Sequence, residues 1–320
     1  MGELKGNGCR ISGTGSYVPE KILTNDDLSH IVDTNDEWIS SRTGIKERRI
    51  MGDDETRTHM SVMAAKAAIE DAGIKPEDID YIICAIMYGD YITPSHACCV
   101  QHELGITCPA FDINTACSGF LFALDVAQSF IKTKKNINRV LVIATESMSR
   151  IIDWTDRATC VLFGDGSGAA VVERCEEDDL ISFAEHAQGN AEVLYIDNGE
   201  KSKPAVRMNG TEVFKFAVTS AQRDINEALE AAGMKMEDID HVILHQANKR
   251  ITNSVISKLG LSEEKFVSTI HKYGNTCASG VAMALDEAAR EGRLKNGDII
   301  AFAAFGGGLS SAASIVRWNK

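Results

Sequence analysis

The chain contains an internal repeat at half its length, and this repeat limits the folds that it can adopt. Residues 67–83 read AAIEDAGIKPEDIDYII, and residues 227–243 read EALEAAGMKMEDIDHVI. Each copy combines an apolar helix, an Ala-Gly stop, a Glu-Asp-Ile-Asp turn and a buried strand. Glu77 corresponds to Glu237, an offset of 160 residues in a chain of 320. We therefore expect two similar halves, residues 1–175 and 176–320, fused around a shared core.

The same offset pairs two cysteines. Cys117 lies in NTACSGF, and Cys277, which is 160 residues later, lies in GNTCASG. A two-fold repeat brings equivalent loops together at its pseudo-dyad. The Cys117 loop and the loop that contains Asn275 and Cys277 should therefore face each other across one site.

Composition narrows the classes of function. The chain is 44% hydrophobic and 25% charged, which is typical of a globular protein, and it has no 18-residue apolar run or apolar secretion signal. Nine cysteines without a CxxC pair indicate reduced cytoplasmic thiols rather than a zinc site. A net charge of −13 argues against nucleic acid as a partner. We expect a cytoplasmic protein with no metal and no membrane contact.

Strands and helices alternate along the whole chain, which indicates an α/β fold. Segment 118–132 is apolar nearly all round and predicts a buried helix, and segment 278–292 is its counterpart in the second half. Residues 9–19 predict a strand that ends in a Gly-rich turn, and residues 159–175 predict two short strands around a glycine loop. Residues 184–206 lose periodicity and predict a surface excursion that joins the two halves.

Cys117 is the first candidate for chemistry, because it follows a predicted strand and precedes the first buried helix. The unpaired N–H groups and positive potential of a helix N-terminus favour a thiolate, which could attack a thioester. The alternative is an inert buried thiol, which is the commoner state of a free cysteine.

His245 and Asn275 are the next candidates. His245 ends the repeated strand at the edge where α/β sheets bind ligands, and the repeat has Ala85 at the equivalent position. It is either catalytic or a structural histidine whose ring makes its hydrogen bonds at the end of a strand. Asn275 follows glycine, which normally marks a turn, but the repeat places it opposite Cys117. Its neutral amide could donate a hydrogen bond to an enolate.

The remaining candidates for a functional role are a run of glycines and a set of cations. The stretch 306–308 is Gly-Gly-Gly after an apolar strand, which indicates a tight connection or a backbone N–H close to a substrate oxygen. Several cations in the second half form either a solvated surface or, in an acidic chain, an attraction for an anionic partner. These cations are Lys215, Lys249, Arg250 and Lys258.

Together these motifs resemble one known family over essentially the whole chain. They are GTGSYVPE, DEWISSRTGI, CPAFDINTACSGF, TDRATCVLFGDGSGAAVV, GTEVFKFAV, HQANKRI, GNTCASG and FGGG. The chain is similar to β-ketoacyl-acyl carrier protein synthase III, a decarboxylating condensing enzyme of the thiolase superfamily. The resemblance implies a homodimer with a thiolase-like α/β fold, in which two pseudo-symmetric βαβαβαββ halves form a five-layered α-β-α-β-α core.

The resemblance also implies roles for the catalytic candidates. Cys117 would accept the acyl group of an acyl-CoA primer. His245 and Asn275 would stabilise the enolate that forms when malonyl-acyl carrier protein loses CO₂. The backbone N–H groups of Cys117 and Gly307 would form the oxyanion hole. Acyl-CoA is a substrate in this chemistry, and the resemblance implies no metal and no redox cofactor.

Binding residues follow from the same resemblance. Trp38 and Arg157 match positions that bind the adenine of coenzyme A, and Arg42 lies in the adjoining RTGI motif. The cations that match or neighbour the docking patch for acyl carrier protein are Lys215, Lys249, Arg250 and Lys258.

The chain departs from the family pattern in three places. Thr93 stands before Pro94 where the acetyl-specific bacterial form has Phe, which narrows the acyl pocket from the partner subunit. A Thr implies a wider pocket and a branched or longer primer. Cys277 stands where Ser is usual and is either buried or close enough to modify the site. The stretch LSSAAS, at 309–314, replaces an aromatic-containing segment.

Other classes of function stay open. A related condensing enzyme or acyltransferase of specialised, polyketide-like metabolism would keep the same Cys, His and Asn. A papain-like hydrolase also uses these three residue types, but its His must act as the base of the thiol. The third alternative is a non-catalytic scaffold that binds coenzyme A. A second cysteine near the C-terminal glycines, expected in a thiolase, is absent from residues 303–309.

Overall fold

The computed structural model describes residues 6–199 and 203–320. Residues 1–5, which belong to the segment where no secretion signal was expected, lie outside the described residues, as do residues 200–202 of the predicted excursion. Within the described ranges, no helix has both the length and the apolar character needed to cross a bilayer.

Both halves of the chain repeat one order of strands and helices. The first half contains β1 (Gly8–Tyr17), α3 (Arg57–Asp71), β4 (Tyr81–Ala85), α4 (His96–Leu104), β5 (Ala110–Ile113), α5 (Gly119–Thr133), β6 (Arg139–Ser147) and β7 (Asp165–Cys175). The second contains β8 (Leu180–Ala187), α7 (Gly210–Ala232), β11 (His241–Leu244), α8 (Lys249–Leu259), β12 (Phe266–Val267), α10 (Ser279–Arg290), β13 (Ile299–Gly306) and β14 (Ser310–Arg317). Both read βαβαβαββ, and the boundary expected at 175/176 falls between β7 and β8.

Each half forms a five-stranded mixed sheet. The strand order is β1-β7-β6-β4-β5 in the first sheet and β8-β14-β13-β11-β12 in the second. Tyr81 pairs with Val140 between β4 and β6, and His241 pairs with Ile300 between β11 and β13. The two registers therefore match residue by residue at the 160-residue offset of the sequence repeat.

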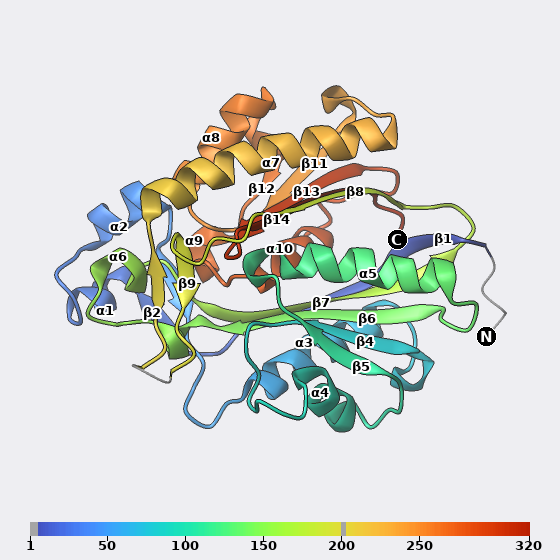
Figure 1. Cartoon of the computed structure of the whole chain (residues 1–320), viewed down its shortest axis with the longest axis horizontal. Helices are drawn as coiled ribbons and strands as arrows, with labels where there is room; N and C mark the ends of the chain where they lie inside the picture. The colour runs from blue at the N-terminus through green and yellow to red at the C-terminus, as the bar shows by residue number, and fades with distance from the viewer. Residues whose placement is uncertain (1–5, 200–202) are drawn as a thin grey trace.

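The sheets and helices stack in five layers (Figure 1). Helices α5 and α10 lie between the two sheets and share one core with the inner faces of both. Helices α3 and α4 cover the outer face of the first sheet, and α7 and α8 cover that of the second. The predicted α-β-α-β-α architecture is confirmed.

Carboxylates that bind backbone N–H groups explain why the Glu-Asp-Ile-Asp turn occurs twice. Asp78 and Asp238 each accept the N–H of the residue three positions earlier, at 2.9 and 2.8 Å, and so close a short 3₁₀ turn. Asp80 and Asp240 each accept an N–H at the start of the neighbouring strand, β6 or β13. The motif thus ends a helix and aligns two strands with one short stretch of chain.

The glycines of residues 159–175 do not form the predicted loop. Gly166 and Gly168 lie inside the unbroken strand β7, and Gly164 lies between this strand and the short helix α6 (Arg157–Cys160). A Cβ at Gly168 would lie 2.5 Å from the Cβ of Ala282, and one at Gly166 would lie 2.7 Å from the Sδ of Met283. The glycines are therefore inside a strand because α10 packs directly on its backbone. The Gly-rich turn predicted near residue 15 is likewise part of β1.

Two insertions lie at one end of the layers, on the left in Figure 1. The first contains β2 (Ile22–Thr24), α1 (Asn25–Ser29), α2 (Asp36–Thr43) and β3 (Glu47–Arg49). The second is a two-stranded ribbon of β9 (Leu194–Ile196) and β10 (Val206–Met208). The thiols and amide of the predicted site lie at the same end of the molecule.

A fully buried arginine fixes the first insertion. The Arg48 guanidinium donates to the Leu23 carbonyl at 3.1 Å, and to Asn25 Oδ1 and the Val161 carbonyl at 2.9 Å each. Burial lowers the pKa of Arg48 to about 10. Its three acceptors join the insertion to the segment that follows α6, so both depend on one side chain.

Gly168→Ala tests the contact between β7 and α10. The added methyl group should lower the free energy of unfolding by about 1–3 kcal/mol, because the backbone and Ala282 must both move. Denaturant titration followed by circular dichroism measures the change. Gly210→Ala is the matched control, since nothing lies within 4 Å of the added group, and it should leave stability unchanged or slightly raised. Equal effects of the two substitutions would contradict this account of the glycines.

Candidate active site

Cys117 lies in a 3₁₀ turn, Ala116–Ser118, that leads directly into α5. Its counterpart Cys277 lies just before α10, and the two Sγ atoms are 3.1 Å apart. The predicted convergence of the two loops at the pseudo-dyad is therefore correct. Cys277 has φ of 53°, in the left-handed region, as does Ala116 with φ of 48°. Both loops thus bend sharply where the helices begin.

The loop that holds Cys117 is fastened to the C-terminal glycines. Ser118 Oγ and Ser310 Oγ are 2.9 Å apart, and Ser310 Oγ also lies 3.0 Å from the Thr115 carbonyl. A Cβ at Gly306 would lie 2.8 Å from the Cβ of Cys117, so only glycine allows the strand to approach. The glycine run 306–308 was expected to form a tight connection or to place a backbone N–H near a substrate oxygen, and Gly306 is the member that lies against Cys117.

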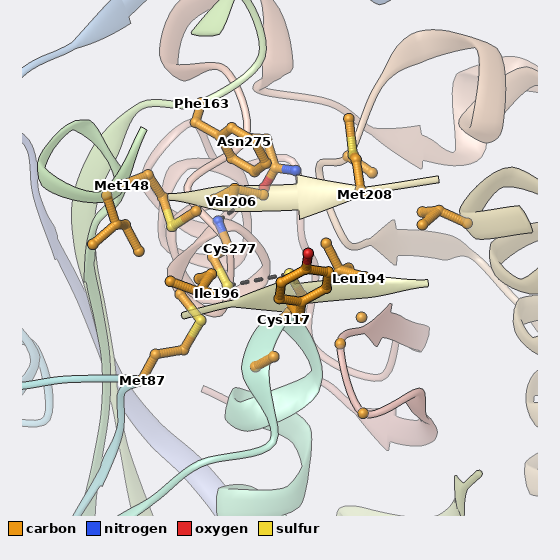
Figure 2. Close-up of a pocket in the computed structure, with 18 of the residues that line it drawn as sticks. Met87, Cys117, Met148, Phe163, Leu194, Ile196, Val206, Met208, Asn275 and Cys277 are labelled. Atoms are coloured by element: carbon orange, nitrogen blue, oxygen red, sulfur yellow. Dashed lines mark hydrogen bonds between the residues drawn. The ribbon is translucent and has the colours of Figure 1, made fainter. Parts of the chain in front are cut away.

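Asn275 is held by its backbone on one side and by its side chain on the other. Its N–H donates to the Leu162 carbonyl at 2.9 Å, and its carbonyl accepts the N–H of Gly164 at 3.0 Å. Its Oδ1 accepts the N–H of Cys277 at 2.9 Å. Because Oδ1 is occupied, the amide presents its Nδ2 donor to the cavity beside the thiols (Figure 2).

His245 follows β11 and continues that strand's pairing with β13. Its N–H donates to the Ala303 carbonyl at 2.7 Å, and the edge of its ring packs on Phe305 with centroids 5.5 Å apart. Nδ1 is buried and has no partner among the described residues. Cys117, His245 and Asn275 all line one cavity. His245 therefore lines the site in addition to following a strand.

The two thiols share one negative charge. The hydrogen bond from Cys277, aided by the charge of His245 and opposed by burial, holds the pKa of Cys117 well below its usual value. The same hydrogen bond and burial raise the pKa of the Cys277 thiol well above its usual value. Cys117 is thus the thiolate, and Cys277 keeps its proton and donates it.

A buried carboxyl group under the site was missed by sequence reasoning. Glu146, at the end of β6, is 1% exposed, and its Oε1 accepts the N–H of Met87 at 3.2 Å. Burial, together with the nearby Cys117 charge, raises the pKa of Glu146 well above its usual value. Burial therefore favours the uncharged form of Glu146 beside the Cys117 thiol. No motif distinguished it from other acidic residues in the sequence.

The cavity in front of Cys117 has a volume of about 1520 Å³. Figure 2 shows Met87, Met148 and Phe163 on its wall, with the β9–β10 ribbon across it. The ribbon contributes Leu194, Ile196, Val206 and Met208. The surface excursion expected at 184–206 is therefore wrong for this part, because the ribbon forms an apolar cover over the site.

The three residues expected to bind coenzyme A are gathered around one ring. The guanidinium carbons of Arg42 and Arg157 lie on the ring of Trp38, each 4.7 Å from its centroid. Arg42 also lines the cavity, and Arg157 donates to the Asp33 carbonyl at 2.9 Å. Trp38 lies in α2 and Arg157 in α6, so the first insertion supplies one side of this platform.

The remaining predicted residues are exposed. Thr93 lies on a surface loop outside this chain's own cavity, although its neighbours Tyr91 and Ile92 reach the cavity rim. Arg250 lines the cavity. The other cations are on the surface of α7 and α8 and do not line it. These are Lys215, which is 2.8 Å from Glu212, together with Lys249 and Lys258.

Comparisons with known proteins agree with this geometry. Residues 111–189 match the family model for 3-oxoacyl-[acyl-carrier-protein (ACP)] synthase III, and residues 229–318 match the model for its C-terminal part. The chain is 49% identical to the β-ketoacyl-[acyl-carrier-protein] synthase III of Aquifex aeolicus, over 97% of this chain and 100% of that protein. The chain belongs to the 3-oxoacyl-[acyl-carrier-protein] synthase III family. It is therefore a condensing acyltransferase that initiates fatty acid synthesis.

Relatives and solved structures extend the match. The synthase III of Caldanaerobacter subterraneus is 48% identical over 97% of this chain and 98% of its own. The crystal structure of the Aquifex aeolicus synthase superposes with a TM-score of 0.93 over 97% of this chain and 100% of that one. The priming β-ketosynthase of the R1128 polyketide pathway is 34% identical, with a TM-score of 0.95 over 100% of this chain and 99% of that one.

Cys277→Ala tests the shared charge. Removing the donor should raise the pKa of the Cys117 thiol, so the rise of its alkylation rate with pH should move to higher pH. Iodoacetamide labelling between pH 5 and pH 10, quantified on the Cys117 peptide, measures the midpoint. Cys277→Ser, which supplies a hydroxyl donor, should keep most of the lowering of the Cys117 pKa. A midpoint that is the same in Cys277→Ala and in the unmodified protein would contradict the proposed charge sharing.

Proposed function

We propose that this chain condenses an acyl-CoA primer with malonyl-acyl carrier protein, using Cys117, His245 and Asn275 as its catalytic residues. The observation that carries the proposal is the convergence of these three side chains, from loops of both halves, on one cavity. A thiolate and two hydrogen-bond donors in one apolar chamber suit an acyl transfer followed by the formation of an enolate.

In the first step Cys117 takes the acyl group. Its thiolate attacks the thioester carbonyl of acyl-CoA, the carbon–sulfur bond to coenzyme A breaks, and the released thiolate is protonated as free coenzyme A. The N–H groups of Cys117 and Gly307 stabilise the tetrahedral oxyanion. The lowered pKa of Cys117 supports this step, because it favours the thiolate that attacks the thioester.

In the second step the malonyl group loses CO₂ and becomes an enolate. His245 and Asn275 donate hydrogen bonds to the enolate oxygen, so that carbon remains the nucleophile. That carbon attacks the acyl-Cys117 carbonyl, and the intermediate collapses with departure of the Cys117 thiolate. The products are 3-oxoacyl-carrier protein and CO₂, and the nucleophile is regenerated. No step uses a metal or a redox cofactor.

The primer is an acyl group larger than acetyl. The apolar wall of the cavity, formed in part by the β9–β10 ribbon, supports this assignment. So does Thr93, whose small side chain stands on the loop expected to reach the partner's acyl pocket. Trp38 and Arg157 would hold the adenine of coenzyme A between them after Arg157 moves from the ring.

The two protein partners are a carrier protein and a second copy of this chain. The exposed cations Lys249, Arg250 and Lys258 of α8, with Lys215 of α7, support docking of an acidic carrier beside the cavity mouth. The exposed side chains of Tyr91 and Ile92 and the edge strand β5 support a homodimer. Nine free thiols support a reducing, cytoplasmic location.

One alternative has specific support. The priming β-ketosynthase of a polyketide pathway superposes on the whole chain, so the same Cys, His and Asn could prime specialised metabolism. The carrier protein distinguishes the two functions, because a priming synthase of that kind would extend a polyketide carrier in preference to the carrier of fatty acid synthesis.

Acyl loading tests the nucleophile. Incubation with a panel of acyl-CoAs, from acetyl to branched and medium chains, should add one acyl group to the intact protein and none to Cys117→Ala. Branched or longer chains should load fastest, because the cavity is wide. Thr93→Phe should shift the preference toward acetyl in the dimer. Loading of acetyl alone by the unmodified protein would show that the wide-pocket hypothesis is wrong.

Separate substitutions of the two donors test their role. His245→Ala and Asn275→Ala should each lower the rate of condensation by about 10²–10³-fold, because the enolate loses a donor. Acyl loading should persist in Asn275→Ala, since the amide acts after loading. Single-turnover mass spectrometry separates loading from condensation. Equal losses of both steps in Asn275→Ala would contradict the assignment of the amide to the enolate.

A further inference from the structure

Cys277 has no role in the chemistry described above except to donate a hydrogen bond, yet its thiol touches the nucleophile. The Sγ atoms of Cys117 and Cys277 are 3.1 Å apart, whereas a disulfide bond is about 2 Å long. An approach of about 1 Å by two loop residues would therefore join them. Cys9, Cys98 and Cys175 instead direct their thiols at backbone carbonyls.

The pair is also reachable by a small molecule. Both cysteines line the cavity, although Cys117 is only 9% exposed and Cys277 only 1%. The cavity is wide enough for a substrate acyl chain, so hydrogen peroxide can enter it. The thiolate character of Cys117 makes it the more reactive of the two thiols toward an oxidant. Cys277 keeps its proton and stands beside it as a second thiol.

We propose that Cys117 and Cys277 form an oxidative-modification site, in which a peroxide converts the nucleophile and its neighbour into a reversible disulfide. The regulatory meaning of this step rests on the proposed function, because the same sulfur accepts the acyl group. The disulfide removes the nucleophile from catalysis and also protects it from irreversible oxidation.

The two steps balance as follows. The Cys117 thiolate attacks one oxygen of hydrogen peroxide, the O–O bond breaks, and the sulfur is oxidised to a sulfenic acid while the departing hydroxide is protonated to water. The Cys277 sulfur then attacks the sulfenic sulfur, the S–S bond forms and the S–O bond breaks. The leaving hydroxide takes the Cys277 proton and becomes a second water. Two thiols lose two hydrogen atoms in all, and one peroxide is reduced.

An acyl group on Cys117 should block this reaction. The acylated sulfur is a thioester and has no thiolate to attack peroxide. A protein saturated with primer should therefore resist oxidation, and an idle one should not. The fraction of enzyme that is switched off would then depend on both the peroxide and the supply of acyl-CoA.

The test uses the reduced full-length chain and hydrogen peroxide. After quenching with N-ethylmaleimide, the oxidised protein should carry two fewer maleimide groups than the unoxidised protein, because two thiols have become a disulfide. Apart from these two groups, its mass should be lower by two hydrogen atoms. A tryptic map should join the Cys117 peptide to the Cys277 peptide. Acyl loading should fall by at least about tenfold, because no thiolate remains, and dithiothreitol should restore it.

Two variants make the test specific. In Cys277→Ser the cross-link cannot form, and Cys117 should instead gain oxygen atoms that dithiothreitol does not remove completely. In Cys160→Ser, which alters another buried thiol of the same apolar cluster, the Cys117–Cys277 link should still form. Primer present before the peroxide should prevent the link in both the unmodified protein and Cys160→Ser.

The outcomes separate this inference from the proposed function. Oxygen addition at Cys117 in the unmodified protein, to the same extent as in Cys277→Ser and with no joined peptide, would overturn the inference even if acyl loading is normal. A joined peptide in a protein that accepts no acyl group would support the dithiol site and count against the proposed function.

Discussion

The packing of α5 against α10, in the layer between the two sheets, is the constraint on which the site depends. At Gly119, the first residue of α5, a Cβ would lie 3.0 Å from that of Ala85 and 3.6 Å from that of Ala278. Such close approach brings the N-terminal ends of both helices to one point. The thiols of Cys117 and Cys277 meet there because each lies in the turn just before one of these helices.

Burial limits negative charge in this small space. The hydrogen bond to Cys117 and burial raise the pKa of Cys277, and burial raises that of Glu146, which favours the uncharged form of both groups next to Cys117. The N–H of Cys277 also binds Oδ1 of Asn275, so residue 277 influences both the pKa of the Cys117 thiol and the direction of the Asn275 amide. Packing and electrostatics are therefore coupled through residue 277.

The sequence predicted two similar α/β halves because the repeat fixes local structure and strand register together, and the resemblance to the family added the five layers. The 160-residue offset placed Cys117 opposite the Asn275 loop, and His245 was found from its place after a strand. Glycine was the main source of error, since the same residue type serves a loop or a strand that a helix closely contacts, as at Gly168. Glu146 and the ribbon at residues 194–208 could not be found, because their roles depend on burial and on contacts between distant segments.

Arg48 shows how one buried side chain can hold the two parts of a surface platform together. Its guanidinium bonds link the insertion that holds Trp38 to Val161, the residue directly after the helix α6 that holds Arg157. The loops that hold Cys117 and Asn275 take no part in these bonds. The platform around Trp38 is thus anchored apart from the loops that hold Cys117 and Asn275. A change in the apolar wall of the cavity therefore need not disturb the platform around Trp38, since the two are held by different contacts.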